Sequence, residues 1–183
     1  MEKLKTSLKA ASGVFAIIPG LAVLATNIGV PPNCSKVMFF ATIESFGIFT
    51  LLLLRLNHDS FKLFSIKTIN CLAIGAIAVF AFALFLYLYL FSEYVVEFSG
   101  TSPLFFPIWP QGELKQGLAT MGSKINLVKE WGRDDVFHVI RSSSSLMLTY
   151  TTLFFLFVYQ LVFVSLTFAF GILALRVGET DNN

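Results

Sequence analysis

Four long apolar stretches, separated by polar connections, dominate the pattern of hydrophobic and polar positions along the chain. The last stretch, residues 146–175, contains no charged residue. Crossing a hydrocarbon core of about 30 Å takes roughly 20 helical residues, which each stretch approaches or exceeds. Lipid offers the backbone no hydrogen-bonding partner, so a spanning segment must be helical. We therefore predict an all-α integral membrane protein whose four transmembrane helices lie at about residues 13–28, 37–54, 67–91 and 146–175.

The first apolar stretch follows a basic start that contains Lys3, Lys5 and Lys9. This pattern is also typical of a secretory signal peptide, for which residues 23–25 would form a weak cleavage site. We interpret the stretch as the first transmembrane helix. Pro19 removes a backbone donor, so we expect a kink there.

Small side chains recur every four residues in the same stretch, at Ser12, Ala16 and Gly20. Residues four apart lie on one face of a helix, and small residues on a face allow close helix–helix approach in lipid. We predict that this face packs against another helix. The alternative is chance, because small residues are common in membrane helices.

One large connection, residues 92–145, separates the third and fourth apolar stretches. Structureless loops of this length are uncommon, so we expect it to fold or dock. Residues 101–110 contain three prolines and favour irregular chain at the membrane interface. Residues 113–131 predict one amphipathic helix. Its apolar face would consist of Leu114, Leu118, Met121, Ile125 and Val128. Such a helix could lie in the membrane interface, cover its own bundle or that of a neighbouring subunit, or act as a plain structural cap.

The distribution of Lys and Arg predicts the orientation, because cytoplasmic connections carry an excess of both. Seven of the thirteen lie in short segments at the termini and at residues 55–67, whereas five of the other six lie in the 92–145 connection. Charge in long connections has little influence on orientation. We therefore expect both termini in the cytoplasm and the 92–145 segment on the extracytoplasmic side of a bacterial inner membrane.

Glu44 is the only acidic residue within a predicted span. An ionisable group inside the bilayer is costly unless it is paired, protonated or hydrated, so it is a candidate functional residue. One interpretation is a pore-lining or proton-sensitive acid. The other is a structural carboxyl group hydrogen-bonded to a polar side chain of another span. Gln160, Thr42 and Ser45 offer polar groups for that role.

Composition excludes several functions. The chain has 183 residues, a net charge of +2, two cysteines and two histidines. The charge is too small and dispersed to predict nucleic-acid binding. His58 and His138 lie on opposite predicted sides, so we expect no metal site. No phosphate-binding, dinucleotide-binding or nucleophile motif occurs, so we expect neither a cofactor nor an enzyme.

The small size, four spans and single large outward connection resemble the membrane subunit of the Kiwa anti-phage defence system. The resemblance implies a homo-oligomeric membrane sensor that detects infection at the envelope and signals to a cytoplasmic effector. The cytoplasmic connection would supply the partner contacts. These are expected at Arg55, His58, Asp59 and Lys62. One alternative is a small oligomeric ion channel with Glu44 near its outer vestibule, and another is a purely structural four-span protein.

Overall fold

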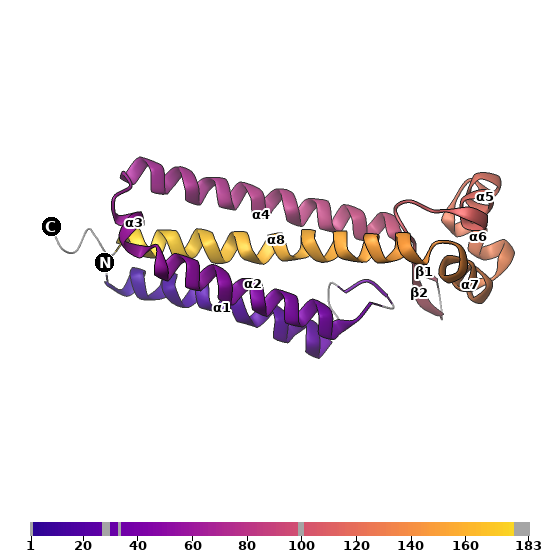
Figure 1. Cartoon of the computed structure of the whole chain (residues 1–183), viewed down its shortest axis with the longest axis horizontal. Helices are drawn as coiled ribbons and strands as arrows, with labels where there is room; N and C mark the ends of the chain where they lie inside the picture. The colour runs from indigo at the N-terminus through magenta and orange to yellow at the C-terminus, as the bar shows by residue number, and fades with distance from the viewer. Residues whose placement is uncertain (1, 27–29, 33, 99–100, 178–183) are drawn as a thin grey trace. The chain divides into compact units, whose positions relative to one another are not determined.

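The computed structural model describes residues 2–26, 30–32, 34–98 and 101–177. Within these ranges the chain forms eight helices and one two-stranded hairpin (Figure 1). The elements are α1 (Glu2–Thr26), α2 (Lys36–Leu56), α3 (His58–Lys62), α4 (Ile66–Tyr94), β1 (Val95–Phe98), β2 (Thr101–Phe105), α5 (Gly112–Met121), α6 (Lys124–Trp131), α7 (Arg133–Ser143) and α8 (Ser145–Val177).

Four of these helices are long and apolar enough to cross a membrane, which confirms the predicted number of candidate spans. Their apolar windows are Thr6–Val23, Lys36–Leu56, Ile66–Tyr94 and Ser145–Ala174. Helix α1 begins eleven residues before the predicted span, since 13 − 2 = 11, and it continues through Pro19. The predicted basic start is therefore part of the helix.

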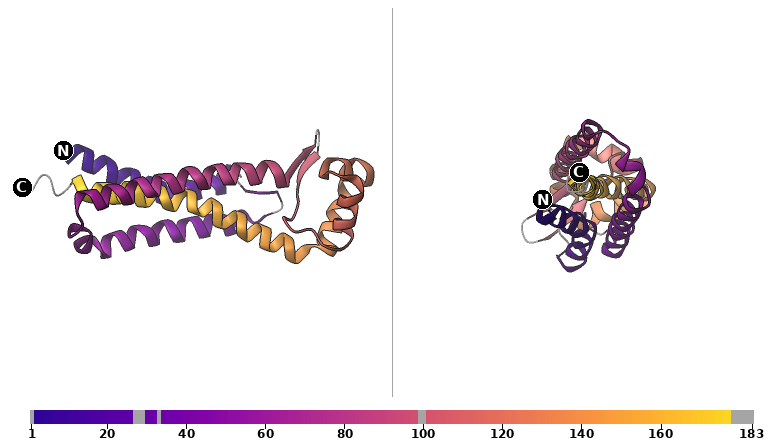
Figure 2. Two further views of the ribbon diagram at one scale, coloured as in Figure 1. Left: turned by 90° about the horizontal axis from the view of Figure 1, so that it is seen from above. Right: turned by 90° about the vertical axis from the view of Figure 1, so that its left-hand side faces the viewer.

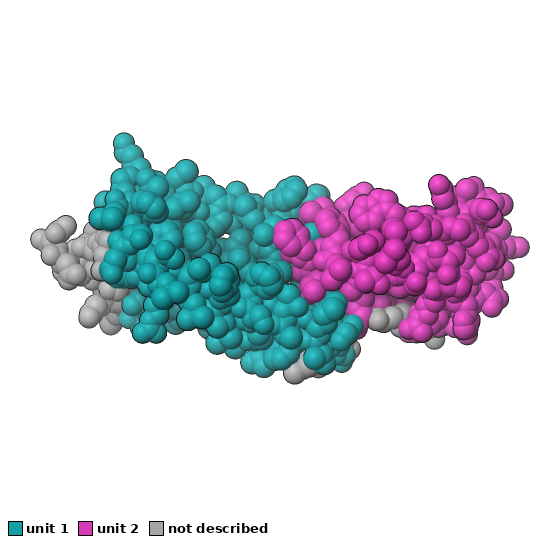
Figure 3. All heavy atoms as spheres, in the orientation of Figure 1, with its two compact units in different colours: residues 1–30, 35–85, 158–183 teal, residues 31–34, 86–157 magenta. Residues whose placement is uncertain are grey.

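The chain divides into two compact units (Figure 3). Unit 1 comprises residues 1–30, 35–85 and 158–183, and unit 2 comprises residues 31–34 and 86–157. Helices α4 and α8 each contribute residues to both units. Seen end-on, the long helices are viewed roughly along their axes (Figure 2), so those of unit 1 run parallel or antiparallel to one another.

In unit 1, helices α1 and α2 pack closely along most of their length. Ala16 is fully buried, and a side chain at Gly47 of α2 would collide with its carbonyl oxygen. Gly20 similarly faces the Glu44 side chain. Glycine at both positions allows the two helices to approach, because any β-carbon there would overlap an atom of the other helix.

Helix α8 completes this packing through its unit 1 residues. Ser12 Oγ of α1 donates a hydrogen bond to the Thr167 carbonyl oxygen at 2.8 Å, and the Phe15 and Phe170 rings stack at 5.3 Å. Gly171 leaves room for the Leu54 side chain of α2. The three small residues predicted to form one face of the first helix thus all lie at contacts with α2 or α8.

Unit 2 has its own hydrophobic core, built from the hairpin and helices α5, α6 and α7. Its fully buried side chains include Leu104, Phe106, Leu114, Leu127 and Val136. Strands β1 and β2 pair antiparallel, with Val95 opposite Phe105. Residues 101–105 therefore form a strand where irregular chain was predicted, within a chain that is otherwise mainly helical, as predicted. Pro103 is tolerated in β2 because a two-stranded ribbon has open edges.

The helix predicted over residues 113–131 is divided in two. Gly122 ends α5 with a φ of +71°, a conformation that a residue with a β-carbon rarely adopts. The break rotates the face that α6 presents to the core. As a result Leu127 is fully buried and Ile125 is 50% exposed, whereas the sequence pattern had placed Ile125 on the apolar face. Leu114 and Val128 are buried, and Leu118 and Met121 pack against the core.

A second break separates α7 from α8 at Ser144. Two hydrogen bonds hold a bend at Ser144, so α7 is a helix separate from α8. Gln111 N donates to Ser144 Oγ at 2.9 Å, and that hydroxyl donates to the Gln111 carbonyl oxygen at 3.2 Å. About two helical turns further along α8, Ile108 N donates to Thr151 Oγ1 at 2.9 Å. These bonds attach the connection before α5 to the beginning of α8.

Replacing Gly47 by alanine should destabilise the α1–α2 contact. The new methyl group would meet backbone that cannot move without separating the helices, and such overpacking costs about 1–3 kcal/mol. Gly13→Ala is the matched control, because no described atom lies within 4 Å of its β-carbon position. Alanine favours a helix by up to about 1 kcal/mol over glycine, so the control should be neutral or stabilising. Thermal midpoints of the detergent-purified proteins measure both, and equal midpoints would contradict the contact.

The break at Gly122 predicts opposite results for two neighbouring residues of α6. Leu127→Ala should destabilise unit 2 by roughly 2–5 kcal/mol, because it empties a fully buried position. Ile125→Ala should change stability by no more than about 0.5 kcal/mol, because the side chain is half exposed. Limited proteolysis of residues 92–145 and the thermal midpoint report the difference. Greater sensitivity at Ile125 would instead indicate the uninterrupted helix.

Candidate functional site

Glu44 lies on α2 with its carboxyl group against Gly20 of α1. The side chain is partly exposed, but its Oε1 atom is buried and has no hydrogen-bond partner among the described residues. Thr42, proposed as a possible partner, donates instead to the Met38 carbonyl oxygen of its own helix at 2.7 Å. The carboxyl group is therefore held by packing, and within the described chain Oε1 is not satisfied by a neighbouring span.

Gln160 on α8 is more deeply buried than Glu44. Only 6% of its surface is exposed, and neither amide atom has a hydrogen-bond partner within the described ranges. The hydroxyl of Thr167, further along the same helix, is also buried without a partner there. Burying an unpaired polar group costs about 1–3 kcal/mol, so these positions are energetically unfavourable for unit 1 alone.

The residues predicted to contact a cytoplasmic partner lie at the end of α2 and in α3. His58 Nδ1 is 3.4 Å from Asp59 Oδ1, and Asp59 is almost fully exposed. Arg55 is exposed in the last turn of α2, where a cation interacts favourably with the helix dipole. The side chain of Lys62 and the tail from residue 178 lie outside the described part of the chain.

Arg55 and His58 also line a pocket of unit 1 of about 460 Å³. Lys9 of α1 contributes a second cation, and the small residues Gly171 and Ala174 of α8 lie at its wall. The sequence pattern did not predict that these residues lie together, because Lys9 is near the beginning of the first span and Arg55 at the end of the second. The sequence does show that both residues are basic and that each lies near the end of its helix, and two consecutive antiparallel helices bring these ends together.

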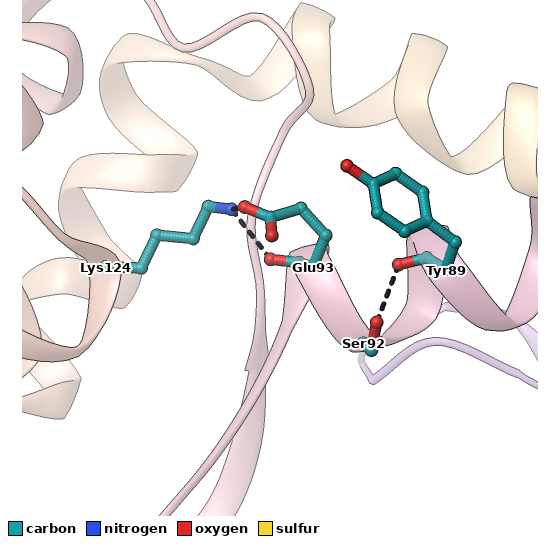
Figure 4. Close-up of polar contacts among 4 residues, drawn as sticks. All are labelled: Tyr89, Ser92, Glu93 and Lys124. Atoms are coloured by element: carbon teal, nitrogen blue, oxygen red, sulfur yellow. Dashed lines mark hydrogen bonds and ion pairs between the residues drawn. The ribbon is translucent and has the colours of Figure 1, made fainter.

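A second pocket, of about 540 Å³, lies in unit 2 and contains an ion pair that the sequence analysis missed. Lys124 Nζ contacts Glu93 Oε1 and donates to the Glu93 carbonyl oxygen at 2.7 Å (Figure 4). The same ammonium group lies 4.4 Å from the centre of the Tyr94 ring. Lys124 therefore links α6 to the last turn of α4, where unpaired carbonyl groups accept hydrogen bonds from a cation. No regular spacing relates the two residues.

Arg133 makes a comparable link between α7 and β2. Its Nε donates to the Ser102 carbonyl oxygen at 2.9 Å, and its guanidinium group also contacts Ser102 Oγ and Asp134. A rigid planar fork with several donors suits this simultaneous contact. Within unit 2, Lys124 thus connects α6 to α4, and Arg133 connects α7 to β2.

The two cysteines, Cys34 and Cys71, are both free thiols. Cys34 Sγ lies 3.5 Å from Thr152 Oγ1 within unit 2. Burial raises the pKa of the Cys34 thiol, and the hydrogen bond with Thr152 only partly offsets that effect. A raised pKa reduces the thiolate fraction, so Cys34 has the character of a packing residue and not of a nucleophile.

The described residues contain no group of three or more His, Cys, Asp or Glu side chains able to hold a metal ion. Comparison with protein-family models, curated proteins and solved structures gave no match. The geometry itself therefore supplies the functional argument. It offers two distinct polar features in unit 1, the Glu44 carboxyl group and the basic pocket, and a folded unit 2 between the third and fourth candidate spans.

Proposed function

We propose that the protein is a non-enzymatic membrane sensor and scaffold, which oligomerises and couples a signal at the cell envelope to a cytoplasmic effector. One observation supports this most directly: helices α4 and α8 are each continuous from unit 2 into unit 1. A helix is stiff along its axis, and shifts of packed helices by 1–2 Å are an established route for switching. A ligand that moves residues 86–94 of α4 therefore also displaces residues 66–85.

Each unit carries polar features that suit one part of this function. Unit 2 carries a pocket and a folded surface for the signal. Unit 1 carries the exposed residues Arg55 and Asp59 and the half-buried His58, which offer a polar surface to a partner. The resemblance to the Kiwa membrane subunit makes phage infection the signal to test, with a bacterial inner membrane as the location and both termini in the cytoplasm.

Substituting the polar residues predicted to contact a partner at the α2–α3 connection should release the effector without disturbing the membrane protein. The variant replaces Arg55, His58, Asp59 and Lys62 together by alanine. The control replaces Lys115, Gln116, Glu113 and Lys129, which are exposed in unit 2 and carry the same set of charges. Mild-detergent purification from the native host, followed by mass determination of the intact complex, measures the outcome.

The unmodified protein and the control should give a multiple of 20.3 kDa plus a stoichiometric soluble protein. The four-residue variant should keep its oligomeric mass and lose at least about tenfold in bound partner, as expected when a charged contact worth about 1.4 kcal/mol or more is removed. Partner binding that survives all four changes rules out this connection as the docking surface. A homo-oligomer without any partner rejects the scaffold function.

The Glu44 geometry supports a second candidate, a small oligomeric ion channel with this carboxyl group near its vestibule. The Glu44 side chain is partly exposed although its Oε1 atom is buried, so the exposed part of this acidic side chain can contribute to a polar pathway formed between copies of the chain. The purified protein in vesicles should then conduct cations, and Glu44→Gln should lower the flux several-fold because a ring of charge is lost. Glu113→Gln, on the exposed surface of α5, is the control. Vesicles that show no flux with the unmodified protein remove this candidate.

A further inference from the structure

The basic pocket of unit 1 is lined by two cations and a histidine from three separate elements. Lys9 comes from α1, Arg55 from α2 and His58 from α3. No acidic residue is among its described lining residues. Asp59 contacts the His58 ring but does not line the pocket, and neither Lys9 nor Arg55 forms an ion pair within the described ranges. Two formal positive charges and a histidine thus share one concave site, and no described residue of the chain supplies a counter-ion to Lys9 or Arg55.

The pocket lies at one end of the apolar windows of three candidate spans. The window of α1 begins at Thr6, three residues before Lys9, and that of α2 ends at Leu56, one residue after Arg55. Ala174, another lining residue, is the last residue of the α8 window. At about 1.5 Å per residue, all three positions lie within roughly 5 Å of the end of an apolar segment. That is the depth at which lipid headgroups meet the hydrocarbon core.

The rest of the lining is mainly apolar. Leu51 lies about one helical turn before Arg55, and Leu54 directly precedes it. Gly171 contributes no side chain. A cationic rim above an apolar wall matches a phosphodiester attached to a glycerol and its acyl chains. Basic pockets between transmembrane helices are known to take anionic lipid headgroups. Soluble phosphate compounds share the charge but make no use of the leucine side chains.

We propose that this pocket is a specific binding site for one anionic phospholipid, whose phosphate group is held by Lys9, Arg55 and His58. A cation at a helix C-terminus or beside a membrane interacts with lipid in any case, but such contacts are diffuse. A specific site differs in being saturable, at one lipid per chain, and in depending on these three residues. The proposal does not rest on the sensor function, and its test needs no partner.

Native mass spectrometry of the purified, delipidated full chain tests the site, with phosphatidylglycerol added in steps. One saturable lipid per chain is expected, with phosphatidylcholine binding much more weakly. The test variant is Lys9→Gln with Arg55→Gln, and the control is Lys115→Gln with Lys129→Gln, which removes the same charge from exposed positions of unit 2. Each interfacial cation contributes about 1 kcal/mol, so the test variant should bind about 30-fold more weakly while the control is unchanged.

A third variant, His58→Gln, keeps the two formal charges and should weaken binding less than the double change. Thermal midpoints of all variants show whether they remain folded. An equal loss of lipid affinity in the test and control variants would show that only net charge matters, and would overturn the proposed site. Equal affinity for phosphatidylcholine would overturn the requirement for an anionic lipid. Displacement of the lipid by millimolar inorganic phosphate would overturn the lipid itself as the occupant.

Discussion

The four apolar helices satisfy most of their backbone hydrogen bonds internally, so side chains decide how these helices pack. In unit 1 the packing of the helices depends on glycine residues at the points of contact. Gly47 admits the Ala16 backbone, Gly20 admits the Glu44 carboxyl group, and Gly171 admits Leu54. Because lipid tails are as apolar as leucine, close van der Waals approach replaces the hydrophobic effect as the source of association. The positions of Glu44 and of the basic pocket both follow from this approach.

Unit 2 is assembled by a different physical principle. Its helices are short and amphipathic, and three glycines at positive φ, Gly112, Gly122 and Gly132, separate or begin them. Short helices are marginal on their own and gain stability by burying an apolar face. The hairpin and helices α5 to α7 supply that burial around Leu114 and Leu127. Lys124 and Arg133 then pair the polar ends of these elements, which is useful because short helices leave many terminal backbone groups unpaired.

The sequence predicted most where the physical signal is longest. Twenty or more apolar residues specify a spanning helix almost without competition, and a small residue at every fourth position identified the α1 face that contacts α2 and α8. It predicted least where one residue changes the outcome. The apolar spacing from Leu114 to Val128 fits a single helix, but a backbone turn at Gly122 removes Ile125 from the core and brings in Leu127. The Glu93–Lys124 pair and the pocket around Lys9 depend on which helix ends lie side by side in the fold. The spacing of residues along the sequence does not predict those contacts.

Glu44 and Gln160, the two polar residues that the sequence places within apolar spans, differ in how deeply they are buried. Gln160 has only 6% of its surface exposed, so another copy of the chain cannot reach its amide group unless α8 moves away from its neighbours. Glu44 is partly exposed, and its carboxyl group can contact a group from outside the chain while remaining packed against Gly20. A strong inter-subunit hydrogen bond in lipid is worth about 1–2 kcal/mol at most, so neither residue could hold an oligomer together alone. Glu44 can therefore lie at the margin of a contact between copies of the chain, whereas the Gln160 amide group belongs to the interior of unit 1.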